Sequence, residues 1–132
     1  MKIKLACGTD DGIEFSNEHF GSSKYFLIYE LDLDTKKLKF LEKLENSSPE
    51  EKIHGDPKKA KKISELIEEA SVLVGFKMGP NIIRIRKKFI PVISREKNIK
   101  IALEELKGLS PEIKIELNKK NETNKKILYI ND

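Results

Sequence analysis

The amino-acid sequence predicts a mixed α/β fold, in which helices connect strands of a single sheet. Short runs of aromatic and β-branched residues, bounded by turn-forming residues, are typical of strands. Two of these runs are separated only by the largely polar residues 32–37, which is the pattern of a hairpin. Longer stretches in the second half repeat apolar residues at helical spacing. At 132 residues, the chain has the length of one domain with its own core.

Five strands are expected. The first ends at Gly8, where turn-forming residues follow. The second is rich in aromatic residues, and the third alternates through Leu38, Phe40 and Leu44. The fourth is short and apolar, and the fifth begins at Phe89. The predicted strands cover residues 3–7, 25–31, 38–44, 72–74 and 89–93.

Three helices are expected between and after the later strands. Asp56 can cap the first, with Pro57 at its first helical position. The second begins after Gly79, and the third is capped by Asn98 and ends before Gly108, which suits a left-handed C-terminal cap. The residues expected on the buried sides are Ala60, Ile63, Leu66, Ile67 and Ala70, then Ile82, Ile83 and Ile85, then Ile99, Ala102, Leu103 and Leu106.

Chain direction brings the least generic residues to one edge of this sheet. The hairpin reverses the chain twice, and each helix returns it, so strands one, three, four and five point the same way. The loops after strands one, three and four then share an edge, where open α/β sheets usually bind ligands. The residues of this predicted ligand site are Asp10, Asp11, Gly12, His19, Phe20, Gly21, His54, Gly55, Met78, Gly79, Pro80 and Asn81.

The same residues also resemble a known family. The stretches that carry the resemblance are Asp10-Asp11-Gly12, His19-Phe20-Gly21, Tyr25-Phe26-Leu27-Ile28 and Gly75-Phe76-Lys77-Met78-Gly79. Their order and spacing resemble the dinitrogenase iron-molybdenum cofactor biosynthesis family, also called NifX-like. The resemblance assigns residues 1–108 to a NifX-like domain and leaves residues 109–132 as an extension.

The resemblance implies a fold, a function and a class of partner. The fold is a ribonuclease H-like three-layer α/β/α domain with a five-stranded mixed sheet. The function is a non-catalytic one: to bind or carry an anionic iron-sulfur or iron-molybdenum cluster, or a precursor, that is not permanently bound. The partners would be proteins that donate or accept the cluster. Self-association is a further option, and nitrogen fixation itself is not implied.

The extension after Gly108 predicts an added β-hairpin. Ile113, Ile115 and Leu117 alternate with charged residues, and a polar stretch precedes the apolar residues 127–130. Such a hairpin would cover a sheet edge or pair with another chain, because exposed edges are templates for association.

Cluster ligation is restricted by the cysteine count. Iron-sulfur clusters are usually held by several thiolates, and the sequence contains one cysteine, Cys7. The remaining candidate ligands are His19 and His54, since imidazole binds many metals. Cys7, His19 and the possible thioether contact Met78 each have a structural alternative. Cys7 continues the apolar alternation of its strand, His19 can orient its loop through a hydrogen bond, and Met78 serves either as a soft contact or as packing.

Other functions compete with cluster binding. Asp10, Asp11, Glu14 and Glu30 are acidic, but adjacent carboxylates in a turn project in different directions, so we do not expect the metal site of a nuclease. A metal-free module that binds a small anion or nucleotide would use the same glycine turns. A protein-interaction module would use the hairpin and the lysines at positions 58, 59, 61 and 62.

Composition excludes several classes of protein. The formal charge is +4, but lysine and arginine are interspersed with acidic residues, so a nucleic-acid partner is not expected. No apolar run is long enough to span a bilayer, so a membrane partner is not expected either. The first residues lack the apolar core of a signal peptide, and we therefore expect a cytoplasmic location.

Overall fold

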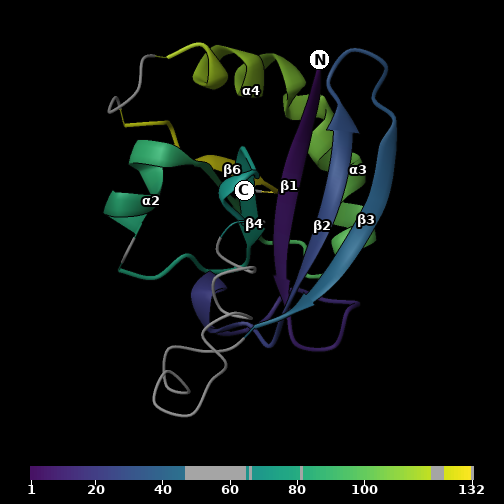
Figure 1. The fold of residues 1–132 in the computed structure, drawn as a ribbon, viewed down its shortest axis with the longest axis vertical. Helices are drawn as coiled ribbons and strands as arrows, with labels where there is room; N and C mark the ends of the chain where they lie inside the picture. The colour runs from purple at the N-terminus through teal and green to yellow at the C-terminus, as the bar shows by residue number, and fades with distance from the viewer. Residues whose placement is uncertain (47–64, 66, 81, 120–123, 132) are drawn as a thin grey trace.

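One mixed sheet organises the computed structural model, which describes residues 1–46, 65, 67–80, 82–119 and 124–131 (Figure 1). The strand order is β3-β2-β1-β4-β5-β6. β2 runs antiparallel to β1 and β3, whereas β1, β4, β5 and β6 are parallel to one another. The strands are β1 (Lys2–Thr9), β2 (Tyr25–Asp32), β3 (Leu38–Glu45), β4 (Val72–Gly75), β5 (Ile90–Ser94) and β6 (Leu128–Ile130).

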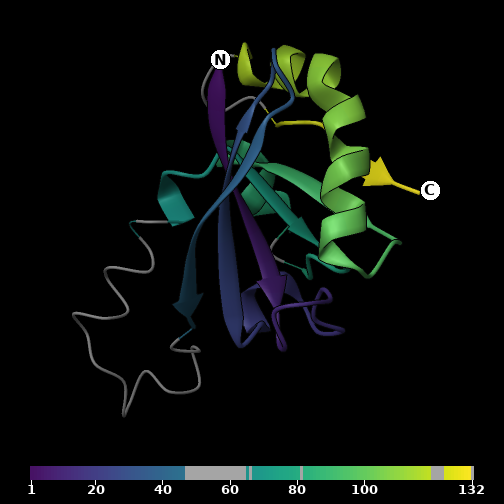
Figure 2. The same cartoon turned by 90° about the vertical axis from the view of Figure 1, so that its right-hand side faces the viewer.

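Helices pack against both faces of the sheet. On one face lie α3 (Ile99–Leu106) and α4 (Ser110–Leu117), which are joined by the 3-10 turn η3 (Lys107–Leu109) (Figure 2). The opposite face packs against α2 (Ile82–Lys88) and the 3-10 turn η1 (Phe20–Ser22). The fold therefore has a sheet between two apolar layers, as expected for an α/β domain.

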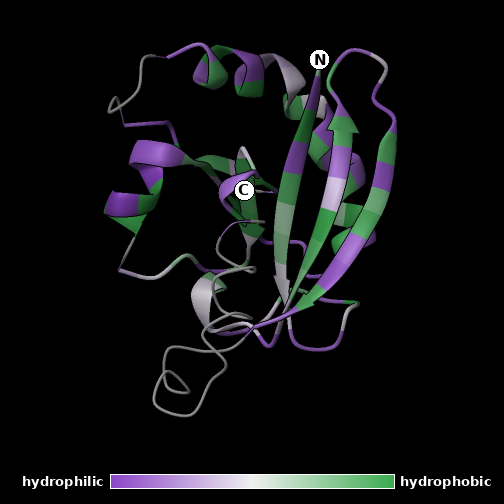
Figure 3. Ribbon diagram, in the orientation of Figure 1, coloured by the Kyte–Doolittle hydropathy of each residue, from purple (hydrophilic) through white to green (hydrophobic). Residues whose placement is uncertain are grey.

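Alternation along the strands separates the two apolar layers. In β1, Leu5 and Cys7 face the layer with α3, while Ala6 faces the layer with α2, and all three side chains are fully buried. Toward the beginning of β1 the second face becomes polar, and Figure 3 shows hydrophilic bands between hydrophobic ones on β1, β2 and β3. Successive side chains of a strand point to opposite faces, so one face of a strand can be solvated while the other is buried.

Most of the predicted elements are present. The five expected strands form, and Asn98 caps α3 by accepting a hydrogen bond from the Ile101 amide at 3.0 Å. Two details of the predicted helices are wrong. Ile83 was expected on the buried side of its helix, but it is 66 % exposed. Ile82 and Ile85 are the residues of α2 that pack in part against the sheet, and Ile83 points away from it. Gly108 is not among the glycines with positive φ, because the chain continues helically through η3 into α4.

The predicted C-terminal hairpin and the five-stranded sheet are wrong. Residues 110–117 form α4 instead of a strand, and its buried residues are Ser110, Ile113 and Glu116, which recur at helical spacing. The alternating isoleucines indicated a strand. In the helix, however, the polar Glu116 lies on the buried side, where it accepts a hydrogen bond from the Lys126 amide. Residues 128–130 do form a strand, but it pairs in parallel with β5 as a sixth strand.

Part of the first predicted helix lies outside the described residues. This applies to its cap Asp56, to Pro57 and to the expected buried residues Ala60, Ile63 and Leu66. Residues 67 and 68 are helical, and Ile67 and Ala70 pack in the apolar layer that also contains α2, as predicted.

Candidate functional site

The loops after β1 and β4 and the end of β3 lie at one end of the sheet, which we call the loop edge, as chain direction predicts (lower end in Figure 1). The loop after β1 contacts the segment after β4 directly. His19 and Lys77 form an isolated parallel bridge, in which the Phe20 amide donates to the Lys77 carbonyl at 2.8 Å. The end of β3 joins the same edge, because Asn46 Nδ2 donates to the carbonyls of Gly21 and Ser23 at 2.9 and 2.8 Å.

His19 and Gly79 lie in contact at this edge. A Cβ atom added to Gly79 would stand 2.7 Å from Cγ and 2.8 Å from Nδ1 of the His19 ring. Gly79 also has a φ angle of +81°, a conformation that favours glycine. The turn after β4 therefore needs glycine for two reasons, and the second is to leave room for an imidazole ring from another loop. The His19 side chain itself is exposed.

Phe20 anchors the short turn that carries His19. Its side chain is 5 % exposed, and its ring lies 5.1 Å from that of Phe26 on β2. Beneath the turn, a Cβ atom at Gly8 would stand 2.3 Å from Ser23 Oγ, so the backbone of β1 approaches η1 closely. Gly21, in contrast, has open space around its Cα. Phe20 is therefore a structural support, and Gly21 lies at the exposed surface of the edge.

Asp10 and Asp11 both stabilise the loop after β1, but in different directions. Asp10 accepts hydrogen bonds from Ser16 Oγ at 3.0 Å and from the Lys24 amide at 2.9 Å. Asp11 Oδ1 accepts from the amides of Glu14 and Ile13 at 2.9 and 2.8 Å, and these bonds lower the pKa of its carboxyl group. The next residue, Gly12, has a φ angle of +83°. These contacts agree with the turn-stabilising interpretation of the two carboxylates.

Two further predicted contact residues are buried. Cys7 is fully buried among the residues that face α3, and this burial raises the pKa of its thiol. Met78 is 4 % exposed and packs in the opposite layer with Phe20 and Phe26. The structure thus places both sulfur atoms in apolar layers, on different faces of the sheet. His54, Gly55 and Asn81 lie outside the described residues.

The sequence reasoning missed residues of the loop after β5 that also reach this edge. Lys97 Nζ donates to Asn17 Oδ1 at 2.7 Å and lies 5.0 Å from the centre of the Phe76 ring. The Lys97 carbonyl accepts from the Phe15 amide at 2.9 Å. A shallow pocket of about 90 Å³ lies here, lined by Asp10, Asp11, Glu14, Phe15, Ser16, Asn17 and Lys97. The signal was available, because β5 was expected to run parallel to β4.

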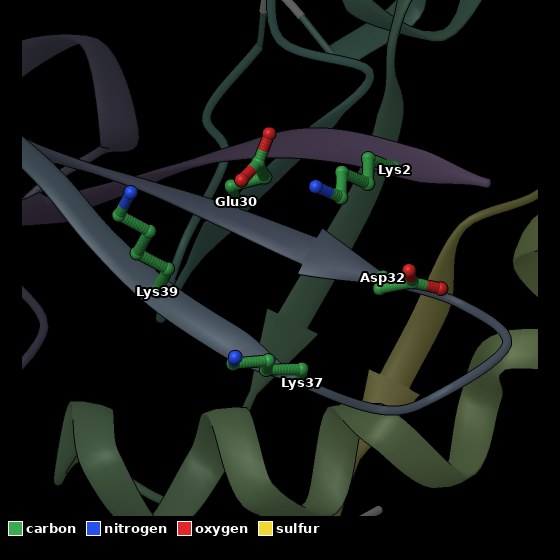
Figure 4. Close-up of a pocket in the computed structure, with 5 residues that line it drawn as sticks. All are labelled: Lys2, Glu30, Asp32, Lys37 and Lys39. Atoms are coloured by element: carbon green, nitrogen blue, oxygen red, sulfur yellow. The ribbon is translucent and has the colours of Figure 1, made fainter.

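A second pocket lies at the opposite end of the sheet. It has a volume of about 180 Å³ and is lined by Lys2, Glu30, Asp32, Lys37 and Lys39 (Figure 4). Lys2 pairs with Asp32 across β1 and β2, and Glu30 pairs with Lys39 across β2 and β3. Cross-strand neighbours of opposite charge stabilise a sheet modestly. We interpret this pocket as part of a solvated sheet face, far from the loop edge.

The described residues provide few metal ligands close to one another. Within them, no group of three or more histidine, cysteine, aspartate or glutamate side chains is arranged to hold a metal ion. His19 is the exposed imidazole at the loop edge. The described helices include none with the length and apolar character needed to cross a membrane.

The fold and this edge define a class of protein: a mixed α/β domain whose loops gather an exposed imidazole and two glycine turns at one end of the sheet. Comparison of the sequence with protein families is more specific. The family described as dinitrogenase iron-molybdenum cofactor matches residues 1–108, and the chain belongs to this family. The predicted family is thus confirmed. No curated protein matches the sequence.

Proposed function

We propose that the chain is a non-catalytic accessory protein that binds or carries an anionic iron-sulfur or iron-molybdenum cluster, or a precursor of one, at the loop edge. The observation that carries the proposal is the exposed His19 imidazole. It lies against Gly79, and the two belong to separate loops that are bridged to each other. The family supports the class of cargo, because its description names the iron-molybdenum cofactor. Its partners would be proteins that donate the cluster or accept it.

The chemistry of the edge suits cargo more than a permanently bound cofactor. Imidazole nitrogen binds iron and other transition metals. With one such ligand from the protein, the other coordination positions of the metal would be filled by atoms of the cluster. A carrier must release what it binds, so few protein-metal bonds are an advantage. We propose His19 as the ligand within the described residues, with His54 as a second ligand outside them. Asp10, Asp11, Gly12, Phe20, Gly21, Met78 and Gly79 would shape the edge.

Two structural assignments belong to the same proposal. We propose that residues 1–108 form the NifX-like domain and that residues 109–132 are an addition to it, since the family match ends where η3 begins to lead into α4. We also propose the ribonuclease H-like class for the domain. It is supported by the three strands β1, β2 and β3 in antiparallel succession followed by parallel β4 and β5.

Anaerobic titration of the full chain with an iron-sulfur cluster and with iron-molybdenum cofactor tests the function. We expect binding at a defined stoichiometry and about tenfold weaker binding in His19→Ala, which corresponds to loss of one coordinate bond of roughly 1.4 kcal/mol in net free energy. His54→Ala should also weaken binding. The control is Lys39→Ala, at the opposite end of the sheet, which should bind normally.

Two results would contradict the proposal. One is the absence of binding to every cluster tested while the chain remains folded. The other is equal affinity of the His19→Ala variant and the unaltered chain. A thermal-shift screen with metal-free anions and nucleotides separates the alternative, because a regulatory module would be stabilised by one of these ligands and not by clusters.

A further inference from the structure

Hydrogen bonds to its backbone hold the segment that contains β6. Lys125 exchanges two hydrogen bonds with Arg86 of α2: its amide donates to the Arg86 carbonyl, and its carbonyl accepts from Arg86 Nε, both at 2.7 Å. The Lys126 amide donates to Glu116 Oε1 at 2.6 Å. The Ile130 carbonyl accepts from the Arg95 amide at 3.0 Å. Bonds of this kind recognise an extended backbone whatever its side chains.

Two side chains supply the apolar part of the contact. Leu128 and Ile130 are 5 % and 3 % exposed and belong to the apolar layer with α3, whereas Tyr129 between them is 46 % exposed. The strand thus presents two alternate side chains to the core and one to solvent, which is the pattern of a strand added to a sheet edge. The pairing covers only three residue positions of β5, from Val92 to Ser94.

The outer edge of β5 offers hydrogen-bonding groups for only a short partner strand. The Ile90 amide donates toward β4, to the Ser71 carbonyl, and the Arg95 amide donates toward β6. Because amides alternate along a strand, positions 91, 93 and 95 face β6, and the first of these is Pro91, which has no N–H. Without the final strand, this edge would offer a short and partly blocked ladder. It can accept a strand of a few residues but not a long one.

We propose that the edge of β5, together with Arg86 and Glu116, is a strand-binding groove, and that it accepts the C-terminal segment of a second copy of this chain when its own segment is released. The bonds from Arg86, Glu116 and Arg95 all join the groove to a segment of only six residues, so the same contacts form equally well between two molecules. β6 is a short strand at the edge of the sheet, and such strands open locally without global unfolding. This inference is independent of cluster binding.

A peptide test measures the groove directly in the full chain. The variant Leu128→Asp with Ile130→Asp places two charges at buried positions, so its own final strand should not pair with β5. A fluorescent peptide of residues 124–132 should then bind to the unpaired edge of β5. We expect an apparent affinity at least about tenfold higher than for the unaltered chain, where the peptide must compete with the resident strand. A peptide with the same two aspartates should not bind. A folded variant that fails to bind the wild-type peptide would overturn the proposal.

Hydrogen exchange of the unaltered chain provides a second test if that variant does not fold. We expect the Arg95 amide to exchange by local opening, faster than a central amide such as that of Val74. Arg86→Ala removes a charged donor to Lys125, and should raise exchange at the Arg95 amide by about tenfold. Arg84→Ala, an exposed neighbour on α2, is the matched control and should change nothing. Equal exchange of the Arg95 and Val74 amides in all three chains would contradict release of the strand.

Discussion

The imidazole ring of His19 lies against the backbone of Gly79, so that a Cβ atom at Gly79 would stand 2.7 Å from His19 Cγ. The two residues come from different loops, one after β1 and one after β4, and the Phe20 amide bonds these loops together through the Lys77 carbonyl. The contact fixes an exposed imidazole of the described edge against the backbone of another loop. Any change at Gly79 should therefore be felt at His19.

Gly79→Ala should destabilise the chain more than Gly12→Ala does. Both glycines have positive φ, at +81° and +83°, and the backbone cost of alanine in this region is about 1–2 kcal/mol. Open space surrounds the Cα of Gly12, whereas at Gly79 the new methyl group must also displace His19. Denaturant unfolding measures the difference, and NMR shifts of the His19 ring report its displacement. Equal destabilisation with an unchanged His19 signal would contradict the packing described.

Cys7→Ala should leave cluster binding unchanged and cost about 1 kcal/mol in the free energy of unfolding, because it removes a small buried side chain. Burial also raises the pKa of the thiol, so a thiol reagent should not react with the native chain and should react after unfolding. The relevant readouts are cluster affinity, unfolding free energy and the rate of thiol modification. Loss of cluster binding in Cys7→Ala would show that the thiol takes part in ligation.

Asp11→Ala should destabilise the loop after β1, because the amides of Ile13 and Glu14 lose their acceptor. For two exposed bonds we expect about 0.5–1 kcal/mol, and Asp11→Asn should recover part of it because an amide oxygen still accepts. Denaturant unfolding of the two variants gives the comparison. Unchanged stability of Asp11→Ala together with loss of ligand binding would show that Asp11 is a ligand contact and not a turn residue.

Asp34 should show a pH-dependent contribution to stability. Its carboxylate accepts a hydrogen bond from Lys114 of α4 and contacts the α-amino group of Met1, and these cations lower its pKa from 3.8 to about 2. Since the folded-state pKa is the lower one, the contribution is complete above about pH 4 and is lost as the pH falls toward 2. The side chain is exposed, so salt should weaken the effect.

Carboxyl titration by NMR checks this prediction. In Lys114→Ala the pKa of Asp34 should rise toward its ordinary value, because the first cause of the shift is removed. In Asp34→Asn the unfolding free energy should vary less with pH across this acidic range. An Asp34 pKa that is the same with and without Lys114 would show that the ion pair does not form in solution.

Chain direction predicted more of this molecule than residue patterning did. The β2 and β3 hairpin and the returning helices were sufficient to bring the loops with His19 and Gly79 to one edge, which is where the structure places them. Chain direction also explains why Lys97, which follows β5, lies at this edge. The direction of β5 was predicted correctly, but Lys97 was not included in the predicted site. Topological arguments survive small errors in element boundaries because only the sense of each strand matters.

Patterning failed where a polar residue occupied a buried position. In α4, Glu116 is 4 % exposed and bonds to the Lys126 amide and Lys119, so the helix buries a carboxylate and exposes Ile115. Read as alternation, the same residues indicated a strand. The contact between His19 and Gly79 could not be predicted from the sequence either. A glycine in a turn is explained by its φ angle alone, and nothing in the sequence shows which side chain lies over it.

Amide NMR of the full chain during anaerobic titration with a diamagnetic cluster tests most directly whether the cluster binds at the loop edge. We predict shifts or broadening at His19 to Ser23 and at Met78 and Gly79, with no change at Lys2, Lys37 and Lys39 in the pocket at the far end of the sheet. Perturbation of the far pocket, with the amides of His19 and Gly79 unchanged, would contradict this prediction.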